Sequence, residues 1–114
     1  MTQSDDKKAI FMAKMKALET VFINGLPERM QEISNAVDTC VAQPGEASVV
    51  AILHRYLHSI AGTAGTFGYA ELGERARELE LRLEPALQGG AIAIEVIQET
   101  LPDFRAYLEW VKAN

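Results

Sequence analysis

The chain has 114 residues, and its 11 lysines and arginines against 16 aspartates and glutamates give a net charge of -5 near neutral pH. This length fits one domain, residues 1–114, with the composition of a globular protein. The single cysteine, Cys40, excludes an internal disulfide framework, and no apolar run approaches the roughly 18 residues of a membrane span. The acidic balance argues against nucleic-acid binding, and the first residues do not resemble a secretory signal. We therefore expect a cytoplasmic domain that binds neither membrane nor nucleic acid.

The first predicted helix begins at Ser4, a natural N-cap followed by Asp5 and Asp6 in the first turn. Its apolar side chains recur at helical spacing: Ile10, Phe11, Met15, Leu18 and Phe22. Asn24-Gly25 suits a helix end, and Pro27 either opens the next helix or kinks a continuous one. We assign residues 1–25 to a separate N-terminal helix that packs against the remainder.

Residues 26–114 contain four further amphipathic stretches separated by turn signals. The stretches run from about Pro27 to Ala42, from about Glu46 past Ile60, from about Tyr69 to Leu87, and from about Ala91 to Lys112, with a kink or break expected near Pro102. Cys40 lies on an apolar stripe and is read as a core residue. The predicted fold is all-α, an antiparallel four-helix bundle with an additional N-terminal helix.

The most informative stretch starts at His58 and reads HSIAGTAGTFG, with Gly62, Gly65 and Gly68 following the histidine by four, seven and ten residues. The helix either ends near Ala61 or continues to about Thr66. If it continues, Gly62 and Gly65 each cost roughly 1 kcal/mol relative to alanine, and the surface beside His58 is mostly bare backbone. His58 then points away from the apolar side of its helix toward solvent. A neutral imidazole in such a place has a ring nitrogen free to take a phosphoryl group or a metal.

This spacing, with Phe67-Gly68 and the later apolar positions Leu72, Ala76 and Leu79, resembles the signature of histidine-containing phosphotransfer (HPt) domains. The signature covers about 24 residues, and the helical layout extends the resemblance over nearly the whole chain. It implies that His58 is the phosphoacceptor, that Gly62 leaves room for an incoming receiver domain, and that Gly68 makes the turn into the next helix. The implied activity is that of a phosphohistidine carrier in a two-component phosphorelay, not an enzyme, either as a stand-alone protein or as part of a larger histidine kinase.

One position departs from the family pattern. HPt domains usually carry a lysine three residues after the histidine, where this chain has Ala61. Arg55, three residues before His58, is the candidate to supply the missing positive charge, because a guanidinium can grip phosphate oxygens through two donors. His54 is expected to be a surface neighbour of the site, and Gly65 belongs to the same strip.

The resemblance implies receiver domains as partners and a kinase or kinase domain as the phosphoryl source. We expect no cofactor on this chain, Mg²⁺ on the partner, and a monomer. Two other interpretations remain open. The domain could be a helical adaptor that docks receivers without being phosphorylated, or His54 and His58 could chelate zinc, although a stable zinc site needs further ligands and none cluster in the sequence.

Overall fold

The computed structural model describes residues 3–114; residues 1 and 2, which fall in the predicted N-terminal helix, lie outside the described part. The described chain is helical throughout, with short connections and no strands, so the predicted all-α class is confirmed. The elements are α1 (Gln3–Ala42), α2 (Ala47–Ala64), the 3-10 turn η1 (Gly65–Phe67), α3 (Ala70–Leu83), the 3-10 turn η2 (Glu84–Ala86) and α4 (Gly90–Ala113).

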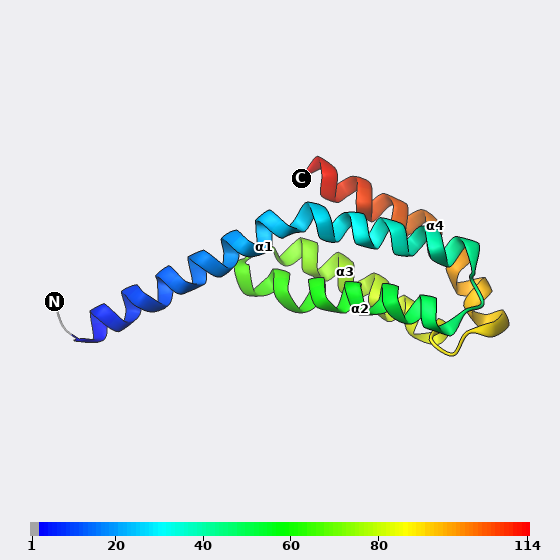
Figure 1. Ribbon diagram of the computed structural model, residues 1–114, viewed down its shortest axis with the longest axis horizontal. Coiled ribbons are helices and arrows are strands. Elements are labelled where there is room, and N and C mark those ends of the chain that lie inside the picture. Colours follow the sequence, from blue (N-terminus) through cyan, green and yellow to red (C-terminus); the bar gives the residue numbers. More distant parts are fainter. Residues whose placement is uncertain (1–2) are drawn as a thin grey trace.

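The second half of α1 packs with α2, α3 and α4 as a bundle whose successive helices run in opposite directions (Figure 1). The buried side chains come from all four helices and form one core, with Ile33, Val37, Leu53, Leu57, Ile60, Leu83 and Phe104 among the largest. Cys40 is 1% exposed and belongs to this core, as its place on the apolar stripe predicts. None of the described helices is both long and apolar enough to span a membrane.

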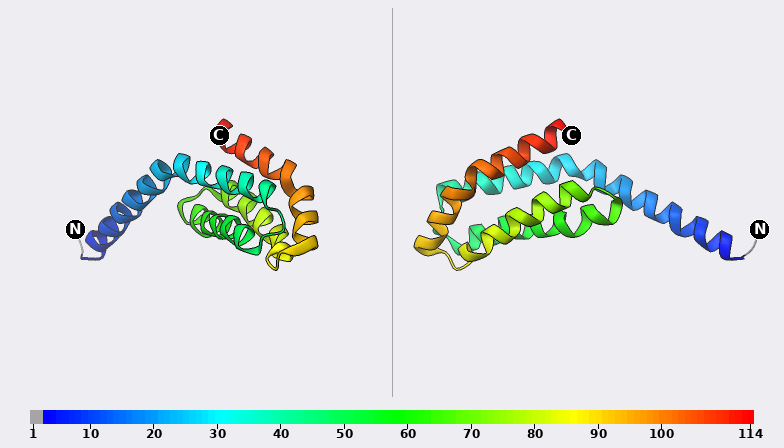
Figure 2. Two further views of the ribbon diagram at one scale, coloured as in Figure 1. Left: turned by 45° about the vertical axis from the view of Figure 1, so that its right-hand side comes forward. Right: turned by 180° about the vertical axis from the view of Figure 1, so that it is seen from behind.

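Helix α1 differs from the prediction because it runs without interruption through Asn24, Gly25 and Pro27. The expected helix end at Asn24-Gly25 is wrong, so residues 3–25 are the first part of α1 and not a separate helix. Pro27 cannot donate a backbone hydrogen bond to the preceding turn, and α1 bends in this region (Figure 2). The alternative of a kinked continuous helix describes the chain correctly.

The first half of α1 extends beyond the bundle and is not packed against it (Figures 1 and 2). Ile10, Phe11 and Leu18 are each more than half exposed, whereas Phe22 is 6% exposed and joins the core. The apolar side chains predicted to hold this segment against the bundle therefore face solvent over most of its length. The sequence pattern identified the helical period correctly, but it could not show where the neighbouring helices end.

The connection between α2 and α3 is fixed by Gly68, whose φ of 87° lies in the left-handed region that favours glycine. The backbone N–H of Tyr69 donates to the carbonyl of Ala64 and that of Gly68 donates to Gly65, which is the Schellman arrangement that closes a helix. Helix α2 thus continues past Ala61, and Gly68 makes the turn into α3 as expected.

Helices α2 and α3 approach closely where Gly73 faces α2. A Cβ placed at Gly73 would lie 3.3 Å from the Cβ of Ala64 and 3.4 Å from the carbonyl oxygen of Ala61.

The next predicted helix, 69–87, is observed as α3 followed by η2, and α4 continues through Pro102 without a break.

Candidate functional site

His58 lies on α2 with its side chain 70% exposed. Leu53, Leu57 and Ile60 occupy the opposite side of the same helix and are at most 1% exposed. The helical period that buries these three residues is also what turns His58 toward solvent. The predicted exposure of His58 is therefore observed.

The imidazole of His58 is held by a carboxylate from the neighbouring helix. Nδ1 of His58 lies 2.5 Å from Oε2 of Glu80, which is on α3 and is 6% exposed. A carboxylate only accepts hydrogen bonds, so this contact requires the proton on Nδ1. In the neutral ring, Nε2 then carries the lone pair and is the nitrogen left free to react.

Glu80 was not identified from the sequence as part of the site. It shares one face of α3 with Gly73, Ala76 and Leu83, all of which are buried. The sequence did contain a signal, because Glu80 is an acidic residue at helical spacing on an otherwise small and apolar face. Such a residue is buried only when it has a partner. What the sequence could not provide was the rotation of α3 relative to α2, which decides that the partner is His58.

His54 lies one turn before His58 and is less exposed than predicted, with 21% of its side chain accessible. Its Nε2 is buried, 3.9 Å from Oε2 of Glu80 and 3.8 Å from Oε1 of Glu84 at the start of η2. His54 thus points toward the carboxylates of α3 and η2, in contrast to the surface neighbour that we expected.

The surface next to His58 is low because Gly62 and Gly65 carry no side chains. Both glycines are exposed, and a Cβ at either would meet no atom within 4 Å. Arg55 is exposed on the same helix and forms no hydrogen bond or ion pair with any residue of the described chain. Ala61, where the family pattern has lysine, is partly buried. The result is an accessible imidazole on a flat strip with one free guanidinium on the same helix.

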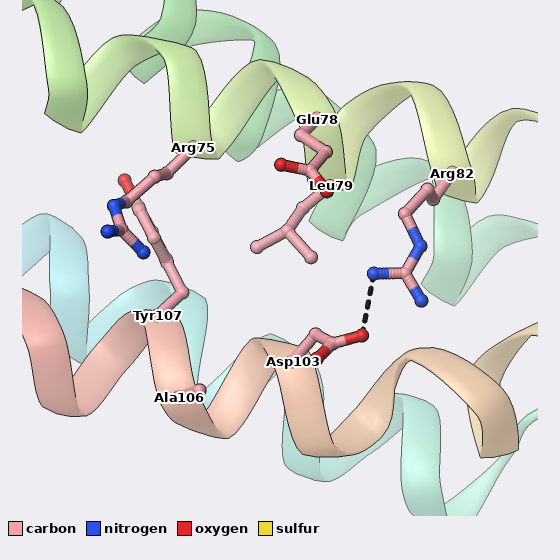
Figure 3. Close-up of a pocket in the computed structure, with 7 residues that line it drawn as sticks. All are labelled: Arg75, Glu78, Leu79, Arg82, Asp103, Ala106 and Tyr107. Carbon is pink, nitrogen blue, oxygen red and sulfur yellow. Dashed lines mark hydrogen bonds and ion pairs between the residues drawn. The ribbon is translucent and has the colours of Figure 1, made fainter.

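A hollow of about 200 Å³ lies elsewhere, between α3 and α4 (Figure 3). Arg75 and Arg82 line it, but Arg82 donates to Asp103 at 2.6 Å and Arg75 donates to Glu71 at 2.9 Å. The guanidinium of Arg75 also lies 4.4 Å from the centre of the Trp110 ring. Both cations are already neutralised, and the hollow shares no residue with the His58 site, so we assign it no chemistry.

Within residues 3–114, no group of three or more histidine, cysteine or acidic side chains has the geometry to hold a metal ion.

The described chain is thus an antiparallel helical bundle in which an exposed histidine, held by a buried carboxylate, lies beside two exposed glycines. The model of the Hpt domain family matches residues 18–112, so the chain belongs to this family. Hpt domains are phosphohistidine carriers of two-component signalling that interact with receiver domains and histidine kinases, and they are not catalytic enzyme domains. No curated protein and no solved structure matches the chain.

Proposed function

We propose that His58 is the phosphoacceptor and that it carries the phosphoryl group on Nε2. The observation that carries the proposal is the 2.5 Å contact between Nδ1 of His58 and the buried carboxylate of Glu80. This contact fixes the tautomer and the ring orientation, while the opposite edge of the ring stays open to solvent. His58 then accepts from a receiver aspartyl phosphate or from a kinase, and it donates to a receiver aspartate.

In the transfer from a receiver, the lone pair on Nε2 of His58 forms a bond to phosphorus as the bond to the aspartyl oxygen breaks. The aspartate leaves as a carboxylate, and the imidazole keeps its proton on Nδ1. The ring therefore gains positive charge in the transition state, next to the carboxylate of Glu80. Transfer onward to a second receiver reverses these steps, and Mg²⁺ held by the partner neutralises the phosphoryl oxygens.

Docking is proposed to use the flat strip formed by Gly62 and Gly65 with His58 at its edge. Because these positions lack side chains, the backbone of a partner can approach until its aspartate reaches bonding distance of Nε2. Arg55 supplies the charge that Ala61 lacks, since its guanidinium is free to bind phosphoryl oxygens. Such a contact is small and short-lived, as a relay requires.

The test uses a panel of receiver domains phosphorylated in advance with acetyl phosphate, and receiver and kinase mixtures supplied with ATP. The wild-type protein is expected to take up phosphate that is acid-labile and base-stable. His58→Gln is expected to take up none, while His54→Gln, which keeps an N–H donor, still takes up phosphate. Uptake that persists in His58→Gln would overturn the assignment.

A non-phosphorylated adaptor remains the alternative, favoured by the alanine at position 61. It predicts that receivers bind the wild-type protein and the His58→Ala variant equally well, with no phosphohistidine formed by any donor. The carrier predicts label in the wild-type protein that is absent from the variant. One set of proteins therefore separates the two functions.

A further inference from the structure

The carboxylate of Glu80 has a second imidazole beside it, which the transfer step described above does not use. Nε2 of His54 lies 3.9 Å from the same oxygen, Oε2, that contacts Nδ1 of His58. This nitrogen is buried and has no hydrogen-bond partner in the described structure, and the same is true of Oε1 of Glu80. Two unpartnered polar atoms are therefore buried on one cluster of three side chains.

Burying polar atoms without partners is costly, at roughly 1–3 kcal/mol for each group. A carboxylate that is 6% exposed also needs positive charge or N–H donors nearby. Among residues 3–114, no lysine or arginine forms an ion pair with Glu80, and its only basic neighbours are His58 and His54. His58 is mostly exposed, so His54 is the basic group that stays beside the carboxylate inside the protein.

We propose that His54 is a positioning residue for the acceptor histidine and that it acts through Glu80. Its Nε2 faces the carboxylates of Glu80 and Glu84 at 3.9 and 3.8 Å, and a proton on this nitrogen keeps the Glu80 carboxylate beside Nδ1 of His58 by electrostatic attraction. The consequence is a His58 ring locked in the tautomer that leaves Nε2 free. The proposal rests on the assignment of His58 as the phosphoacceptor.

The geometry favours this role over direct participation in transfer. Nε2 of His54 is buried and cannot reach an incoming phosphoryl group, whereas the neighbouring His58 is 70% exposed. The distances of 3.8 and 3.9 Å to the two carboxylates are longer than a hydrogen bond. At these distances His54 acts on the Glu80 carboxylate by electrostatic attraction and not through a hydrogen bond.

Imidazole nitrogen-15 NMR tests the proposal directly, because it reports which ring nitrogen carries the proton. In the wild-type protein we expect the Nε2–H tautomer for His54, which a free histidine side chain also prefers, and the reverse, the Nδ1–H tautomer, for His58. A matched pair of variants distinguishes the effect of the N–H donor from the effect of the ring shape. His54→Gln keeps an N–H near the position of Nε2, whereas His54→Phe keeps a ring and removes the donor.

We expect His54→Gln to keep the His58 tautomer and His54→Phe to lose it, with phosphate uptake by His58 at least fivefold slower in His54→Phe. Glu80→Gln serves as the reference for a disturbed partner of His58. Unchanged His58 spectra in His54→Phe, or equal changes in both variants, would overturn the proposal. So would a wild-type His54 that carries its proton on Nδ1, a result that needs no variant to fold.

Failure of the underlying function is distinguishable from failure of the inference. If no donor phosphorylates the wild-type protein, the assignment of His58 as phosphoacceptor fails. The tautomers of His54 and His58 are still measured in that case, and they decide whether His54 orients His58 through Glu80.

Discussion

Replacing Glu80 by methionine is expected to make the protein more stable and a poorer phosphoryl acceptor. Glu80 is 6% exposed, accepts one hydrogen bond from His58, and leaves Oε1 without a partner. Exchange of a buried ion pair for apolar side chains of similar volume is often neutral or stabilising, by up to about 4 kcal/mol, and removal of one partner is costly where it leaves the other charge buried. Loss of the hydrogen bond from His58 costs little, because the His58 side chain is 70% exposed and can bond to water instead.

The size of the effect follows from the length of the chain. Unfolding entropy of about 2.1 cal/mol/K per residue gives roughly 0.24 kcal/mol/K for 114 residues, so each 1 kcal/mol moves Tm by about 4 °C. A gain of about 2 kcal/mol raises Tm by about 8 °C. Thermal unfolding followed by far-UV circular dichroism measures this shift, and phosphate uptake from a phosphorylated receiver measures the loss of function.

Glu78→Met is the matched control, since Glu78 lies on the same helix but is exposed. Its Tm is expected to change by no more than about 2 °C, as surface substitutions usually stay within about 0.5 kcal/mol. A fall in Tm of several degrees in Glu80→Met, with the control unchanged, would refute the reasoning. It would mean that the carboxylate stabilises the fold instead of being retained for the site.

Further predictions concern the close packing at Gly73, the open space at Gly62, the buried thiol of Cys40 and the free guanidinium of Arg55. Gly73→Val should lower Tm by about 4–12 °C, because a Cβ there already lies 3.3 Å from that of Ala64 and overpacking costs about 1–3 kcal/mol. Gly62→Ala has open space and should raise Tm by up to about 4 °C through helix propensity; a lower Tm there would contradict the helical geometry. Burial raises the pKa of the Cys40 thiol from 9.0 to about 11, so native protein at pH 8 should react with a thiol reagent much more slowly than protein unfolded in urea. Since this pKa is raised in the folded state, its contribution to stability is complete below pH 9 and is lost as the pH rises toward 11, which denaturant titrations would detect. Arg55→Ala should slow phosphate uptake or shorten the life of the phosphorylated protein severalfold, measured as label against time. Unchanged label would mean that the Arg55 guanidinium does not bind the phosphoryl oxygens.

The sequence was sufficient to predict the helical class, the core position of Cys40 and the exposure of His58, because each depends on the period of a single helix. The turn at Gly68 followed from the resemblance, and the structure shows that this turn uses a left-handed φ of 87°. Glu80 was missed because its role depends on two helices. Its burial was encoded on one face of α3, but only the packing of α3 against α2 brings it to His58.

The end of the first helix was predicted wrongly for a different reason. Asn24, Gly25 and Pro27 all weaken a helix locally, so a stop was the reasonable expectation. Continuous packing of α1 along the bundle outweighs those local costs from Phe22 onward. The helix propensities of these residues therefore indicated the local cost correctly, but they did not show that the helix continues.

Helix α1 is a single element by geometry but should behave as two in hydrogen exchange. Toward its N-terminal end, the last described contacts of α1 with the bundle are made by Phe22 and Glu19. Phe22 packs against the rings of Phe67 and Tyr69, and the hydroxyl of Tyr69 donates to Glu19 at 3.0 Å. Beyond them an isolated helix of this length is marginal in water. Amide protection should thus decline steeply from Phe22 toward Gln3, so that opening of the free end leaves the acceptor site intact.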